Sequence, residues 1–117
     1  MFKRRTGDAG EQRAESFLRG NGLKPVERNW QCRHGEIDLI MIDGDTLVFV
    51  EVRLRTPLGF ADSAESVDYH KQRRLIQAAS MYLARHPARA EQPCRFDVVG
   101  LEGSEGELSW IRDAFEA

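Results

Sequence analysis

Two runs of residues in the middle of the chain show the side-chain alternation that is typical of a β-hairpin. They cover residues 35–42 and 46–55, are rich in β-forming residues, and are separated by the turn-forming segment Asp43-Gly44-Asp45. Because residues two apart in a strand share a face, one face is predicted to be wholly apolar, with Ile37, Leu39, Met41, Val48, Val50 and Val52. The other face is apolar along most of its length and becomes charged at a single end.

The segments around the hairpin predict two helices and three further strands. Apolar stripes at helical spacing indicate one helix from Gly7 or Asp8 to about Arg19, and a longer one from Val67 to about Arg85. Strands are predicted at residues 24–33, 94–101 and 107–111, and a loop at residues 56–66. The order α-β-β-β-α-β-β predicts an α/β fold with a mixed central sheet flanked by helices, and one parallel crossover through the long helix. A length of 117 residues fits one domain, residues 1–117.

The charged end of the hairpin contains Asp38, Glu51 and Arg53. A loop of Gly44-Asp45 would place Asp38 opposite Glu51, with Cβ atoms roughly 5 Å apart. A loop of Asp43-Gly44 would make the two acids diagonal neighbours, and a three-residue loop would put them on opposite faces unless a bulge restored the phase. Adjacent carboxylates repel each other. Mg²⁺ or Mn²⁺ bound by Asp38 and Glu51 would remove the conflict, and ion pairing with basic neighbours is the alternative.

Charged residues outside the hairpin extend this candidate site. Glu11 lies at the edge of the apolar stripe of the first helix, where it can either face the sheet or remain a surface acid near the helix N-terminus. Lys71, Arg73 and Arg74 lie off the apolar stripe of the long helix, and Arg55 ends the second run. These four basic residues are predicted contacts for nucleic-acid phosphates, although a solvated helix face explains the helical ones equally well.

Composition indicates an ordinary globular protein with an uneven charge distribution. The net charge is −2, yet residues 91–117 contain seven acidic and two basic residues, which leaves residues 1–90 with a net charge of +3. A locally basic surface can bind phosphates even on an acidic chain. The sequence has neither an apolar run long enough to span a bilayer nor a signal-peptide pattern, so we expect a cytoplasmic protein without membrane contact. Two isolated cysteines predict neither a zinc site nor a disulfide.

Several short motifs follow one another along the chain. They are Gly10-Glu11, Arg28-Asn29-Trp30, Gly35-Glu36-Ile37-Asp38-Leu39-Ile40, Val48-Phe49-Val50-Glu51-Val52-Arg53, Lys71 and Arg95-Phe96-Asp97-Val98-Val99. Asp38 followed by Glu51-Val52-Arg53 resembles the signature of the PD-(D/E)XK nucleases. The whole ordered string resembles the YraN family of small bacterial proteins, which are predicted to be endonuclease-like and similar to Holliday-junction resolvases.

The resemblance implies a restriction-endonuclease-like core and a metal-dependent endonuclease that acts on DNA, including branched DNA. Asp38, Glu51 and Arg53 would be its catalytic residues. Glu11 would complete the shell of a Mg²⁺ or Mn²⁺ ion held by Asp38 and Glu51, whereas Glu36 is expected near Arg53, outside the ligand set. Resolvase-like enzymes are often dimers, so a homodimer is also consistent with the resemblance.

Arg53 departs from the nuclease pattern, which has Lys at this position. Lys can change protonation state when buried, whereas Arg stays charged and cannot act as a base. Arg53 can still hold a phosphate through two N–H donors. Two alternatives therefore remain open beside the nuclease: a nucleic-acid-binding module without efficient catalysis, and an interaction protein whose acidic C-terminal segment binds a basic partner.

Overall fold

The computed structural model of the chain describes residues 7–54, 68–102 and 107–117, with side chains from residue 9 onward. The elements follow the predicted order α-β-β-β-α-β-β. In chain order they are α1 (Gly7–Gly20), β1 (Lys24–Cys32), β2 (Gly35–Asp43), β3 (Thr46–Leu54), α2 (Tyr69–Arg85), a 3-10 turn (Pro87–Arg89), β4 (Cys94–Leu101) and β5 (Leu108–Phe115). The predicted loop at residues 56–66 and the side chain of Arg55 lie outside the described residues.

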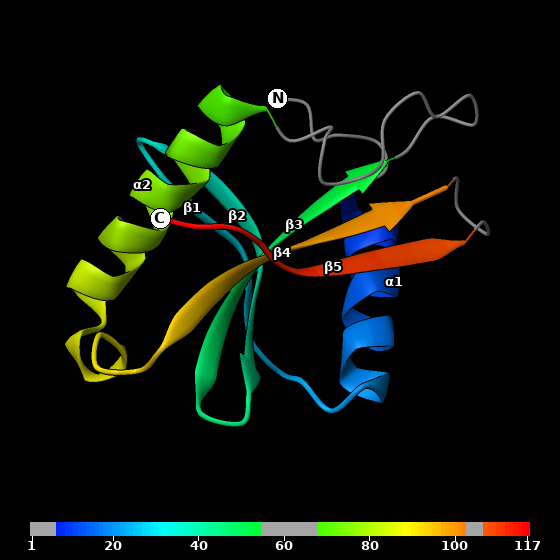
Figure 1. The fold of residues 1–117 in the computed structure, drawn as a ribbon, viewed down its shortest axis with the longest axis horizontal. Coiled ribbons are helices and arrows are strands. Elements are labelled where there is room, and N and C mark those ends of the chain that lie inside the picture. Colours follow the sequence, from blue (N-terminus) through cyan, green and yellow to red (C-terminus); the bar gives the residue numbers. More distant parts are fainter. Residues whose placement is uncertain (1–6, 55–67, 103–106) are drawn as a thin grey trace.

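The five strands form one mixed sheet in the order β1-β2-β3-β4-β5. Strand β3 pairs parallel with β4, and the other neighbours are antiparallel. The chain between β3 and β4 contains α2, which is the predicted crossover. Figure 1 shows α1 and α2 on opposite sides of the sheet, so that the sheet is the middle of three layers.

The β2–β3 hairpin has the first of the three loops considered from the sequence. Asp43 pairs with Thr46, so the loop is Gly44-Asp45, and Gly44 adopts a φ of +65° that suits glycine. The ladder continues to the pair Leu39 and Val50. One step further, this register brings Asp38 level with Glu51.

Each face of the sheet has its own hydrophobic core. The core under α1 contains Ala14, Leu18, Leu23, Leu39, Met41, Val48, Val50, Val99 and Leu101. The core under α2 contains Ile37, Ile40, Leu47, Phe49, Leu75, Ala78, Ala79, Tyr82 and Phe96. Five of the six residues predicted for the apolar hairpin face lie in or against the first core.

The prediction was wrong for Ile37, which is fully buried in the core under α2 with Ile40. Leu39 lies in the core under α1, although Ile37 and Leu39 are two apart and would share a face in a regular strand. The side-chain alternation of β2 is therefore interrupted at Asp38. The boundaries of three elements also differ from prediction: β1 ends at Cys32, α2 starts at Tyr69 after its cap Asp68, and β5 extends from Leu108 to Phe115.

Candidate metal and phosphate site

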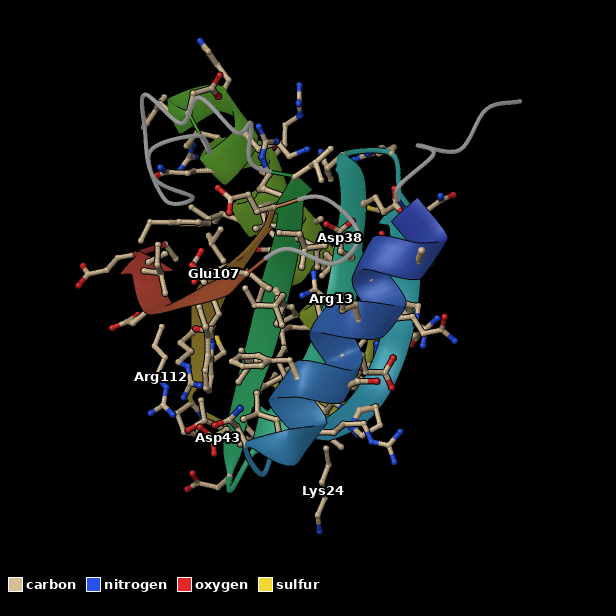
Figure 2. The ribbon with its side chains drawn as sticks, turned by 90° about the vertical axis from the view of Figure 1, so that its right-hand side faces the viewer. Arg13, Lys24, Asp38, Asp43, Glu107 and Arg112 are labelled. Carbon is tan, nitrogen blue, oxygen red and sulfur yellow. The ribbon has the colours of Figure 1, made fainter. Side chains whose placement is uncertain are left out.

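Asp38 lies at the end of the β2–β3 ladder, where its carboxylate replaces a backbone partner. The side chain is 1% exposed, and its Oδ2 accepts a hydrogen bond of 2.8 Å from the backbone N–H of Val52 on β3. Figure 2 shows Asp38 near the beginning of α1, at the end of the sheet opposite Asp43. The hydrogen bond to Val52 ties the position of this acid to both strands of the hairpin.

Glu51 on β3 is a buried acid with a raised pKa. Its side chain is buried, and its Oε2 lies 3.4 Å from Nζ of Lys71 and 3.7 Å from Nη1 of Arg53. The pKa of Glu51 is raised from 4.5 to about 7, mainly by burial and then by the negative charge of Asp38, while Lys71 and Arg53 partly oppose the rise. Near neutral pH this side chain therefore exchanges a proton readily.

A second group of acids adjoins Asp38. One carboxylate oxygen from each of Glu11, Glu36 and Asp38 lies within 4.8 Å of the other two. Glu11 is only 2% exposed although it is charged and lies on α1. Because α1 covers the face of the sheet opposite α2, acids from one layer and the Lys71 amine from the other approach the same end of the hairpin.

A pocket of about 270 Å³ opens at this end of the sheet. It is lined by Gly35, Glu36, Asp38, Glu51, Lys71, Arg74 and Leu75. Gly35 has a φ of +144°, and a Cβ atom there would lie 3.9 Å from Cβ of Arg74, so the β1–β2 turn comes close to α2 at the rim of the pocket. Four charged residue types that bind metals or phosphates thus share one solvent-connected cavity.

The structure brings together most of the residues selected from the sequence. Asp38, Glu51, Lys71 and Arg74 line the pocket, and Arg53 contacts Glu51. Arg73 lies apart from them, in a shallower groove beside His34 on the outer surface of α2.

Glu36 was expected near Arg53, outside the ligand set. The structure places its carboxylate in a cluster with those of Glu11 and Asp38. A signal was available in the sequence, since Glu36 is two residues before Asp38 at the charged end of the hairpin.

The donor set is suitable for a hard divalent cation. Mg²⁺ and Mn²⁺ prefer carboxylate oxygens, and the spacing within 4.8 Å is compatible with three acids converging on one ion. Lys71 and Arg53 provide the opposite charge that a phosphate requires. Groups suited to a cation and groups suited to a phosphate therefore lie side by side.

Comparison with known proteins relates the chain to one family over most of its length. A sequence model described as "Uncharacterised protein family UPF0102" matches residues 10–101, which include every described residue of the pocket. A UPF0102 protein from Alcanivorax borkumensis is 52% identical over 116 residues, covering 97% of this chain and 93% of the relative. A UPF0102 protein from Pseudomonas putida (strain GB-1) is 49% identical over 115 residues, covering 96% of this chain and 94% of the relative.

Proposed function

Because the chain belongs to the UPF0102 family, also known as YraN, its site can be interpreted with that family in view. We propose that the protein is an endonuclease that hydrolyses DNA phosphodiester bonds with Mg²⁺ or Mn²⁺. The observation that supports this most directly is the meeting of buried carboxylates and basic side chains in one open pocket. Buried acids cost stability unless they are compensated, and groups with perturbed pKa values in a cleft are typical of active sites. The strand and helix order agrees with the restriction-endonuclease-like core that we propose for the fold.

Asp38 would hold the cation from the end of the ladder, with Glu51 on one side and Glu11 on the other. Glu36 joins this set because its carboxylate lies with those of Glu11 and Asp38. A cation bound here would lower the pKa of a coordinated water and polarise a phosphoryl oxygen. The acids themselves supply the negative charge and the buried, fixed geometry.

The remaining residues would bind and orient the phosphate. Lys71 and Arg53 both contact Glu51, and each would also contact the scissile phosphate. In the metal-free protein the pKa of Glu51 is about 7, so a cation bound by this carboxylate would displace its proton. Arg74 at the rim would contact a neighbouring phosphate, and Arg73 would follow the strand further along α2. Phosphate contacts carry no sequence information, so recognition would depend on DNA shape, including branch points.

Cleavage of linear, supercoiled and four-way-junction DNA tests the proposal. We expect cleavage with Mg²⁺ or Mn²⁺, none in EDTA, and a loss of at least about 100-fold in Asp38→Asn and Glu51→Gln, with DNA binding largely retained. Glu15→Gln is the matched control, because it removes an acid of α1 that pairs with Arg28 outside the pocket. Equal cleavage by the wild type and both site variants would assign the activity to a contaminant and refute the proposal.

A second function is favoured by one observation, the guanidinium of Arg53 in the position of the nuclease lysine. A nucleic-acid-binding module without catalysis would bind DNA with an affinity that falls steeply with salt and would cleave none of the substrates with either metal. Replacement of Arg53 by Lys distinguishes the two functions, because it would restore cleavage to a scaffold that lacks only the lysine.

A further inference from the structure

The side chains of β1 and β2 change faces together at one point of their ladder. On β1, Arg28 bonds to Glu15 on α1, whereas Trp30 packs against Tyr82 on α2. These two residues of β1 are two apart, so a regular strand would direct both to one face. Their partners behave in the same way, since Arg28 pairs with Leu39 under α1 and Trp30 pairs with Ile37 under α2.

The residues at the switch point are Asn29 and Asp38. They occupy the step between the two pairs, and Asn29 has a φ of +57°. A left-handed residue within a strand rotates the following side chains relative to the preceding ones. Among residues with a side chain, Asn accepts this conformation most readily, whereas a β-branched residue does not.

The side-chain oxygen of Asn29 does not explain why this residue is present. Its Oδ1 is buried, and no group in the described part of the chain donates a hydrogen bond to it. A buried acceptor without a donor lowers stability. This cost directs attention to the backbone conformation of Asn29.

We propose that Asn29 is a positioning residue that acts through its left-handed backbone. Its conformation makes the side chains of β1 change faces at the same step as those of β2. Asp38 therefore departs from the regular alternation, and its carboxylate accepts a hydrogen bond from the N–H of Val52 at the end of the β2–β3 ladder. In a regular strand Asp38 would lie fully under α2 with Ile40. The face switch instead leaves its carboxylate within reach of both Glu11 from α1 and the pocket under α2.

The chain contains a matched control for this proposal. Asp113 on β5 is the other described residue with a side chain and a positive φ, at +53°. Its backbone N–H bonds to Asp97, away from the pocket residues. Asn29→Val and Asp113→Val therefore impose the same backbone strain at two sites, and the glycine variants Asn29→Gly and Asp113→Gly remove it.

Amide hydrogen exchange at Val52 reports the position of Asp38 without any metal. We expect Asn29→Val to accelerate exchange at Val52 at least about 10-fold relative to Val48 in the middle of β3, as Asp38→Ala does, and Asn29→Gly to retain the protection. Asp113→Val should change the amide exchange rates of Val52 and Val48 by the same factor. If Asn29→Val does not fold, Asn29→Ala imposes a milder strain at the same position.

Two results would overturn the proposal. One is a Val52 amide that stays protected in Asn29→Val, and the other is loss of protection in Asn29→Gly, which would assign the role to the side chain. Mn²⁺ titration provides a second readout that rests on the proposed function, with affinity at least about 10-fold weaker in Asn29→Val but not in Asp113→Val. A wild-type protein that binds no Mn²⁺, with the exchange pattern as expected, would refute the proposed function and uphold the role of Asn29.

Discussion

Two regions of the molecule contain buried carboxylates, and the surroundings of these carboxylates differ. Asp97 on β4 is completely buried and saturated: it accepts bonds of 3.0 and 3.2 Å from Arg95, 3.0 Å from the indole N–H of Trp110 and 2.9 Å from the backbone N–H of Asp113. The region around Asp38 has an excess of acids and opens into a pocket.

The difference indicates what each region is for. A buried charge that is surrounded by donors on all sides stabilises a single arrangement, here the β4–β5 pair and its bulge. A cluster of buried acids beside a cavity leaves repulsion that a ligand can relieve, at the expense of the free protein. The Asp97 region therefore maintains the fold, and the Asp38 region is the one for which we propose cation binding.

Removal of Asp97 should have the largest effect on stability. Asp97→Ala would leave the N–H groups of Trp110 and Asp113 without their acceptor and the Arg95 guanidinium with Asp43 as its remaining partner, at a cost of about 3–5 kcal/mol. Asp38→Ala loses the bond from Val52 but relieves repulsion with Glu51, so we expect a change of no more than about 1 kcal/mol. Urea unfolding at pH 8 in EDTA measures both values, and equal losses would contradict the distinction between the two regions.

The free energy of unfolding should fall as the pH rises from 4.5 to about 7. The raised pKa of Glu51 means that the folded state holds its proton over this range while the unfolded state releases it. The contribution of this proton to stability is therefore complete below pH 4.5 and is lost as Glu51 ionises in the folded state. Because one pKa unit corresponds to about 1.4 kcal/mol, the contribution is about 3 kcal/mol. Glu51→Gln should remove this part of the pH dependence in metal-free urea unfolding, and an unchanged profile in that variant would contradict the role of Glu51.

A divalent cation bound at the Asp38 region should restore the free energy of unfolding that is lost when Glu51 ionises. At 100 times its dissociation constant, Mn²⁺ should raise the free energy of unfolding at pH 8 by about 2.7 kcal/mol. The gain should shrink at pH 6, where Glu51 is protonated. Thermal unfolding with and without Mn²⁺ measures the effect. Asp38→Asn should abolish it and Glu15→Gln should preserve it, whereas the same gain in both variants would place the cation elsewhere.

The smallest effect on stability is expected from an exposed ion pair. Arg28 and Glu15 join β1 to α1, and the Arg28 side chain is 37% exposed. Arg28→Ala should cost less than about 1 kcal/mol. It should also leave the Mn²⁺-dependent stabilisation unchanged in the same thermal assay. A larger loss would show that this pair helps to set the face switch at the neighbouring Asn29.

The sequence was sufficient to predict the hairpin, but it left three registers open. The structure has the Gly44-Asp45 loop, the alternative in which Asp38 is level with Glu51. The order of elements and the crossover through α2 also follow from local patterns. The family resemblance to YraN is confirmed by the match over residues 10–101.

The parts that could not be predicted depend on contacts between distant segments. The position of Ile37 follows from the left-handed backbone of Asn29 on the neighbouring strand, and alternation within β2 contains no trace of it. Whether Glu11 faces the sheet was left open by its place at the edge of a helical stripe, and its 2% exposure depends on how α1 packs. The network around Asp97 was missed because two of its four bonds come from Trp110 and Asp113 on β5, which are distant from Asp97 in the sequence.

The three-layer arrangement has a consequence for how the pocket comes into being. Glu11 comes from the layer on one side, Lys71 from the layer on the other, and Asp38 and Glu51 from the sheet between them. A fragment or partly folded chain that lacks either helix would not assemble this group of charges. Any chemistry of the pocket is therefore an all-or-none property of the complete native fold, absent from the nascent chain until both outer layers have docked.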